Sequence, residues 1–189
     1  MGANLLQGQK IRLAAVNPEE MAKCFNRWNL DTEYYRLLDS EPPFPWSEKK
    51  FKEWLEKDLE KEDKNSYFFS IKPMDEDRVI GFIALFDEHW HHGDTLVGIA
   101  IGEREYWGRS YGTDAMQTLL RYAFQELNLR RVGLIVFEYN DRAIRSYEKS
   151  GFVLEGRIRG AMRRDGRRWD WLMMGVLRQE WENKFGEVI

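Results

Sequence analysis

The order in which two hydrophobic periodicities follow each other constrains the fold of this chain more than any other feature of its sequence. Three runs rich in β-branched and aromatic residues, at 67–71, 79–86 and 96–101, are separated by turn residues and predict strands joined by hairpins. Residues 111–127 then show helical spacing of apolar side chains and lead into a further strand at 132–137. Because a helix crossover joins parallel strands whereas hairpins join antiparallel ones, we expect a mixed sheet.

The N-terminal third adds a strand and two helices to this pattern. A strand at residues 11–15 is followed by Asn17 and Pro18, a cap and a first-turn proline that predict a helix. The apolar stripe of this helix is expected to be Met21, Cys24, Phe25 and Trp28. A second helix is expected after Ser47, with a buried face made of Phe51, Trp54, Leu55 and Leu59.

The C-terminal part predicts one short helix and two more strands. The helix at residues 141–149 ends at Gly151, and strand-like runs follow at 152–159 and 169–177. Asp165 and Gly166 form the hairpin turn between them. The predicted order is therefore one strand, two helices, three strands, a helix, a strand, a helix and two strands, with the helices on the faces of the sheet.

The composition is typical of one globular domain over residues 1–189, since 43% of the 189 residues are hydrophobic and no low-complexity linker divides them. A formal net charge of -3 argues against nucleic acid or a membrane surface as the main partner. The chain has no apolar run of about 20 residues and no secretory leader, and Cys24 is its only cysteine. We expect a soluble, cytoplasmic protein without disulfide bonds.

The three histidines of the chain, His89, His91 and His92, lie together just before a predicted hairpin tip. On an extended chain the neighbouring side chains of His91 and His92 point apart, and no second histidine group exists to complete a tetrahedral site. We therefore interpret this cluster as a solvated turn and expect no metal site.

A glycine-containing loop at residues 102–113 connects a predicted strand to the long helix. Backbone N–H groups beside glycines at a helix N-terminus can approach a phosphate group, and the helix dipole favours the anion. The loop lacks the lysine of a P-loop and the three-glycine dinucleotide fingerprint. Taken alone, the loop is a weak signal, because glycines at a tight strand-to-helix turn are more often structural than ligand-binding.

A second segment, about thirty residues further on, is much more specific. Residues 140–152 match the pattern N-x-x-A-x-x-x-Y-x-x-x-G-F at every fixed position. Here the sequence resembles the GNAT superfamily of acetyl-coenzyme A dependent N-acetyltransferases. The phosphate loop of that family, Q/R-x-x-G-x-G/A, falls on residues 107–112, where Gly112 matches the last position and Trp107 and Ser110 depart from the first and fourth.

The resemblance covers nearly the whole chain and implies a fold and a site. The fold would be a single α+β domain with a central mixed, mostly antiparallel sheet of about seven strands and helices on both faces. A V-shaped gap between the strands before the glycine loop and before Asn140 would hold acetyl-coenzyme A. Tyr147 would be the general acid that protonates the leaving thiolate. The residues implied in cofactor binding are Ile99, Ala100, Ile101, Gly108, Arg109, Ser110, Tyr111, Gly112, Thr113 and Asn140.

The resemblance further implies transfer of the acetyl group to a primary amine by direct attack in a ternary complex, without a metal. Because an ammonium must lose a proton before it attacks, we expect a carboxylate base, with Glu88 ranked before Glu103 and Glu138. The tail of the chain is similar to the branch with ribosomal-protein N-terminal, polyamine and antibiotic-modifying acetyltransferases. The acceptor is therefore a protein N-terminus or a small amine, with a polyamine or aminoglycoside as the alternative.

Two further interpretations stay open at this stage. Because Trp107 and Ser110 break the loop pattern, the chain could be a non-catalytic module that binds acetyl-coenzyme A, although the presence of Tyr147 speaks against it. A basic stretch between residues 157 and 168 belongs to the predicted C-terminal hairpin, which in this fold commonly forms the acceptor wall or a homodimer contact.

Overall fold

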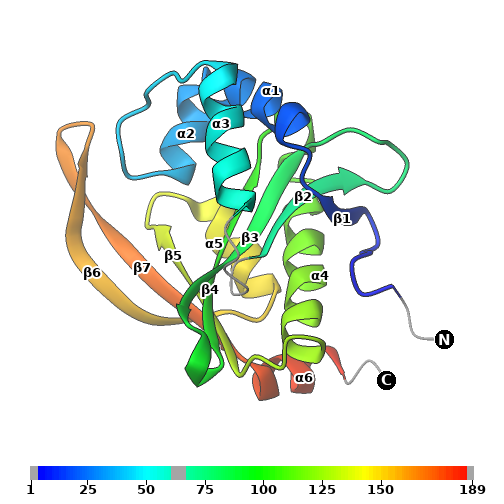
Figure 1. Ribbon diagram of the computed structural model, residues 1–189. Helices are drawn as coiled ribbons and strands as arrows, with labels where there is room; N and C mark the ends of the chain where they lie inside the picture. The colour runs from blue at the N-terminus through cyan, green and yellow to red at the C-terminus, as the bar shows by residue number, and fades with distance from the viewer. Residues whose placement is uncertain (1–3, 61–66, 187–189) are drawn as a thin grey trace.

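The computed structural model describes residues 4–60 and 67–186, except for the side chains of residues 87–90. Its elements along the chain are β1 (Ile11–Ala15), α1 (Pro18–Trp28), α2 (Thr32–Leu38), α3 (Glu48–Leu59), β2 (Tyr67–Pro73), β3 (Gly81–His89), η1 (Trp90–His92), β4 (Asp94–Ile101), η2 (Arg104–Tyr106), α4 (Tyr111–Gln125), β5 (Arg131–Phe137), α5 (Asp141–Lys149), β6 (Val153–Arg164), β7 (Arg167–Leu177) and α6 (Arg178–Phe185). Figure 1 shows α1, α2 and α3 gathered at one end, and the long β6–β7 hairpin projecting to one side.

The seven strands form one sheet in the order β1-β2-β3-β4-β5-β7-β6. Among the described strand pairs only β4 and β5 are parallel, which confirms the mixed, mostly antiparallel sheet. Their pairing is short: it joins Asp94–Leu96 of β4 to residues 131–133 of β5 and goes no further. Beyond Leu96 the two strands diverge, so the sheet has an opening near its centre.

Helices pack on both faces of the sheet, as predicted. One core lies under α4 and includes Leu119, Phe124 and Val132, while the other lies under α1 and α3 and includes Met21 and Leu55. The predicted stripe of α1 is buried throughout. The prediction is wrong for two expected core residues of α3, however, since Trp54 is 43% exposed and Leu59 is 41% exposed.

The reason lies in how α3 is packed. It lies against α1, and only Phe51 and Leu55 of its predicted apolar face are buried. Trp54 and Leu59 flank this narrow stripe on its two sides, where no second element covers them completely. The periodicity predicted the helix correctly and overestimated the width of its buried face.

Two helices were missing from the sequence prediction. Asp31 caps α2 by accepting the N–H groups of Glu33 and Tyr34 at 3.1 and 3.2 Å. The C-terminal helix α6 follows β7 without a loop, and its Trp181 is buried against Phe124, with 5.6 Å between the ring centroids. Both helices are short, seven and eight residues, and carry too few apolar positions for a clear periodic signal.

The histidine turn differs from the prediction in its geometry. His91 and His92 belong to the short helix η1, and their ring centroids lie 3.9 Å apart instead of pointing in opposite directions. The helical turn brings the neighbouring side chains together, whereas an extended chain would separate them. Within the described residues, no group of three or more His, Cys, Asp and Glu side chains could hold a metal ion.

A buried carboxylate joins α1 to the end of β4. Glu103 accepts hydrogen bonds from Trp28 Nε1 at 2.9 Å, from Arg78 at 2.6 Å and from Arg27, and only 8% of the residue is exposed. Burial would raise the pKa of Glu103, but the hydrogen bonds from Trp28 and Arg27 and the charges of Arg27 and Arg78 lower it below its ordinary value. The ionised carboxylate therefore stabilises the folded state.

We expect Glu103→Gln to lower the free energy of unfolding at pH 7 by about 2 kcal/mol, because charge-assisted hydrogen bonds are lost. The folded-state pKa lies below that of the unfolded chain, about 4.3, so the stabilisation is present above that value and is lost as the pH falls through the folded pKa. Urea unfolding should therefore show a smaller deficit at pH 3 than at pH 7.

The matched control is Glu105→Gln, which removes an exposed partner of the same Arg78 and should change stability by less than about 0.5 kcal/mol. An equal deficit at both pH values would show that Glu103 acts through packing and not through its charge.

Candidate active site

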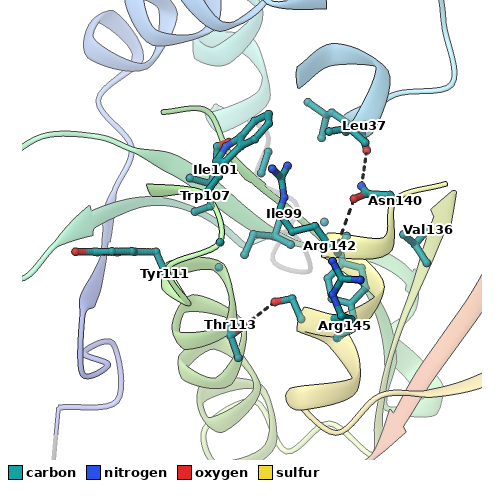
Figure 2. Close-up of a pocket in the computed structure, with 18 of the residues that line it drawn as sticks. Leu37, Ile99, Ile101, Trp107, Tyr111, Thr113, Val136, Asn140, Arg142 and Arg145 are labelled. Atoms are coloured by element: carbon teal, nitrogen blue, oxygen red, sulfur yellow. Dashed lines mark hydrogen bonds between the residues drawn. The ribbon is translucent and has the colours of Figure 1, made fainter. Parts of the chain in front are cut away.

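The opening between β4 and β5 leads into a cavity of about 380 Å³. Its lining comes from the open parts of the two strands, from the loop before α4, from the first turns of α4, from α5, and from α2. Figure 2 shows these elements around the cavity, with α4 and α5 on opposite sides of it. The helix α2, which the sequence prediction lacked, contributes Tyr34, Leu37 and Leu38.

The open edge of β4 carries backbone groups that no strand pairs. Gly102 N–H donates to Ile80 O at 2.8 Å, so the backbone groups of Gly102 face β3. Since these groups alternate along a strand, those of Ala100 also face β3, and those of Ile99 and Ile101 face the opening. All three predicted residues line the cavity, but only Ile99 and Ile101 offer their backbone groups to it.

One of these backbone groups already has a partner. Trp107 Nε1 donates to Ile101 O at 2.7 Å, which fixes the indole ring at the edge of the cavity. Trp107 occupies the first position of the loop pattern, where the family pattern has Gln or Arg. Its indole therefore replaces a strand as hydrogen-bond donor, since it binds a carbonyl group that β5 leaves unpaired.

The loop before α4 exposes a row of N–H groups to the cavity. Gly108 and Ser110 both have φ of 69°, the left-handed conformation, which turns the backbone sharply into the helix. The first bond along the helix runs from Asp114 N–H to Ser110 O at 2.9 Å, so the three preceding N–H groups have no intrahelical partner. They belong to Tyr111, Gly112 and Thr113, all of which line the cavity.

Arg109 is placed differently from its neighbours. Its guanidinium donates to Glu105 O at 3.1 Å, its own carbonyl accepts Lys10 Nζ at 3.1 Å, and it is absent from the cavity lining. Arg109 was implied in cofactor binding, but its guanidinium does not face the cavity, and only its backbone remains in the loop.

Asn140 begins α5 and ties it to α2. Its side chain caps the helix by accepting Ala143 N–H at 3.2 Å, and its Nδ2 donates to Leu37 O at 3.3 Å. The residue is buried and lines the cavity. Further along the helix, the hydroxyl groups of Ser146 and Thr113 lie 2.8 Å apart and join α5 to α4 (Figure 2).

Tyr147 lies on the cavity side of α5 and packs against Phe152, with 5.9 Å between the ring centroids. Burial raises the pKa of Tyr147 to about 12. Its hydroxyl group has no hydrogen-bond partner in the part of the chain that the structure describes. The phenol is therefore fully protonated at neutral pH and available to a bound molecule.

Three cations on α5 also line the cavity, and the sequence prediction missed all of them: Arg142, Arg145 and Lys149. Arg142 is half-buried and lies over the Trp107 ring, with 3.6 Å between the guanidinium carbon and the ring centroid. Burial lowers the pKa of Arg142 below its ordinary value. Among the described side chains that line the cavity there is no Asp or Glu.

The three candidate bases have different surroundings. Glu103 is held by its ion pairs below the sheet edge, and its lowered pKa makes it a poor base. Glu138 is paired with Arg157 at 3.1 Å. The backbone of Glu88 lies in β3 beyond the closed end of the opening, and its side chain is outside the described residues. Neither Glu103 nor Glu138 lines the cavity.

Comparison with known proteins decides the family. The model of the acetyltransferase (GNAT) domain matches residues 10–153, about three quarters of the chain. The chain belongs to the GNAT acetyltransferase family. Its enzymes take an acetyl group from acetyl-coenzyme A, and this GNAT enzyme transfers that group to an amine.

Two relatives support the assignment, one of them over almost the full length of the chain. A prophage-derived uncharacterized N-acetyltransferase of Bacillus subtilis, YokL, is 31% identical over 98% of this chain and all of its own. The spermidine N(1)-acetyltransferase of Vibrio cholerae is 29% identical over 56% of this chain and 61% of its own.

A solved GNAT structure agrees in fold. A crystal structure of the Vibrio cholerae spermidine N-acetyltransferase in complex with CoA and spermine covers 90% of this chain and 97% of its own, at 24% identity and a TM-score of 0.74. The predicted fold class is thereby confirmed. No helix in the described part of this GNAT chain is long and apolar enough to cross a bilayer.

The left-handed backbone conformation of Ser110 allows a test of what the loop costs in stability. Ser110→Gly restores the glycine of the GNAT pattern, and we expect it to raise the free energy of unfolding by about 0.5–1 kcal/mol, because glycine adopts a positive φ without steric cost. Ser110→Ala keeps the cost and should leave stability unchanged, since the serine side chain makes no capping bond. Thermal and urea unfolding would measure both, and a loss of stability in Ser110→Gly would contradict this account.

Proposed function

We propose that acetyl-coenzyme A binds in the cavity between α4 and α5. Three observations on this chain support the fit. The open edge of β4 offers the backbone groups of Ile99 and the N–H of Ile101 to an extended amide-containing arm, as an added strand would use them. The N–H groups of Gly112 and Thr113 at the start of a fifteen-residue helix suit a pyrophosphate. The cations of α5 supply positive charge for a ligand that carries several phosphates.

We propose that Tyr147 is the general acid. Acetyl-coenzyme A supplies a thioester whose carbonyl carbon accepts the amine while the carbon–sulfur bond breaks. The Tyr147 hydroxyl then gives its proton to the departing sulfur, in a ternary complex and without a covalent enzyme intermediate. The new amide nitrogen releases its extra proton to water, and the tyrosinate regains a proton from solvent before the next turnover. The burial that raises the pKa of Tyr147 also disfavours a thiolate in the same cavity, which supports proton transfer to sulfur.

The acceptor we infer is the N-terminal amine of a polypeptide. The observation that carries this choice is the absence of carboxylates from the described cavity lining. A polyamine has several ammonium groups and would enter without a counter-charge, at a considerable desolvation cost. A polypeptide N-terminus has a single amine, whose pKa is near 8. The first side chains of the polypeptide could pack against the apolar Leu37, Leu38 and Ile135 of the cavity lining.

Residues 19–62 contain twelve acidic and eight basic residues, a surplus that would suit a cationic acceptor, but several of these acidic side chains are already paired. Asp31 and Glu33 are both paired with Arg104, and Glu20 is paired with Lys72. A small polyamine is still the second candidate, because a relative is named a spermidine acetyltransferase. A polyamine would have to keep its remaining ammonium groups outside the cavity.

We also propose a cytoplasmic location, supported by a single, buried cysteine.

The homodimer stays a prediction. Four apolar side chains on the sheet face turned away from α4 are exposed, and they belong to neighbouring strands: Ile135, Val153, Ile158 and Met173. Such a patch is compatible with packing against another chain.

We expect Tyr147→Phe to lower kcat by about 100- to 10,000-fold, because the proton donor to sulfur is lost while the ring packing against Phe152 is kept. Affinity for CoA should stay within about threefold. With a pKa of about 12, the tyrosine of the wild type should add no falling limb to the rate between pH 8 and pH 10. Full activity in Tyr147→Phe would exclude it as the acid.

We expect an N-terminal peptide panel to give the highest kcat/KM in a thiol-release assay with acetyl-coenzyme A. Spermidine and an aminoglycoside serve as polycationic competitors, and each peptide is compared with its N-terminally blocked form. Turnover of spermidine above that of every peptide would reverse the acceptor assignment and leave the acetyl transfer itself intact.

A further inference from the structure

Arg142 is a half-buried cation that forms no ion pair with any described side chain, and the nearby charge of Glu33 is already paired with Arg104. No carboxylate pairs with it in the described chain, and the cavity that it lines contains no acidic side chain there. Arg104, the second cation next to Trp107, is neutralised by Asp31 and Glu33 at 2.7 and 2.8 Å. A guanidinium removed from water normally needs a negative partner, so a negative charge is missing from this site.

The side chain of Arg142 crosses the opening of the sheet. It begins in the first turn of α5 and ends on the ring of Trp107, the first residue of the loop pattern before α4 (Figure 2). A π-face is a weak partner compared with an anion, and it leaves the five N–H donors of the guanidinium free for hydrogen bonds. Arg142 is therefore held at the entrance to the loop in a form ready to bind an anion.

The loop itself does not provide such a charge. Arg109 is the cation inside the loop sequence, yet its guanidinium is turned towards Glu105 O and away from the cavity. Arg145 and Lys149 lie further along α5 and are exposed, so their charges are screened by water. Among the described cations that line the cavity, Arg142 is the one next to the ring of Trp107.

We propose that Arg142 is the positioning residue that neutralises the pyrophosphate of coenzyme A, reaching it from α5 across the opening, and that Trp107 holds its guanidinium ready for that contact. This inference rests on the proposed cofactor site. Trp107 replaces the polar first residue of the loop pattern, and the charge missing from the loop is supplied by the opposite wall of the cavity.

The test compares three ligands that differ in their phosphates: CoA, dephospho-CoA, which keeps the pyrophosphate, and pantetheine, which has none. Calorimetry should show that Arg142→Ala weakens CoA and dephospho-CoA alike, by about 10- to 100-fold, because a charge-assisted contact is lost. Pantetheine binding should be unchanged. Arg142→Lys, which keeps the charge, should recover part of the loss.

Two controls separate this contact from general effects. Arg167→Ala removes an arginine that also stacks on a tryptophan, with 3.2 Å to the ring centroid of Trp169, but lies in the hairpin and should leave CoA affinity unchanged. Thermal unfolding should show Arg142→Ala to be folded, because a cation in the first turn of a helix opposes the helix dipole.

The remaining outcomes would overturn the inference. An equal loss for pantetheine would show that Arg142 holds the walls together and does not bind phosphate. A loss for CoA but not for dephospho-CoA would move the contact to the 3′-phosphate, and an Arg142→Lys variant as weak as Arg142→Ala would exclude charge neutralisation. Failure of the wild type to bind CoA would overturn the proposed cofactor site, whereas wild-type binding with an unaffected Arg142→Ala would overturn this inference alone.

Discussion

The structure depends on where the parallel pairing of β4 and β5 stops. Three residues of each strand pair, and beyond Leu96 the strands separate. A sheet normally satisfies its backbone groups by pairing every internal strand, so an opening of this kind leaves donors and acceptors that another group must bind. In this chain Trp107 takes one of them, at Ile101, and the others face a cavity.

The same opening determines what the two following helices can do. Because each of α4 and α5 begins just after one of the diverging strands, their N-termini lie on opposite sides of the cavity, and the Thr113–Ser146 contact limits how far they separate. Unpaired N–H groups come from one wall and positive side chains from the other. A phosphate-bearing ligand therefore meets both walls at once, which neither helix could provide alone.

Much of this arrangement could be predicted from the sequence because it rests on local signals. The β-rich runs, the glycine turn and the segment with Asn140 and Tyr147 each have a short-range pattern, and together they predicted the sheet type and the position of the site. The helices α2 and α6 have weak patterns and are stabilised by long-range contacts, such as those of Trp181 and of Asn140 with Leu37. The cation of Arg142 occupies a variable position of the motif, and its missing counter-ion is visible only once its neighbours are known.

Arg164 joins the β6–β7 hairpin to the end of α2, two segments that lie far apart in the sequence. Arg164, near the tip of the β6–β7 hairpin, donates hydrogen bonds to the carbonyl groups of Arg36, Asp39 and Ser40 and to the hydroxyl of Tyr139. The hairpin and the end of α2 are thus mechanically coupled across more than a hundred residues of sequence. Because Leu37 and Leu38 of α2 line the cavity, this part of the cavity wall cannot move independently of the hairpin.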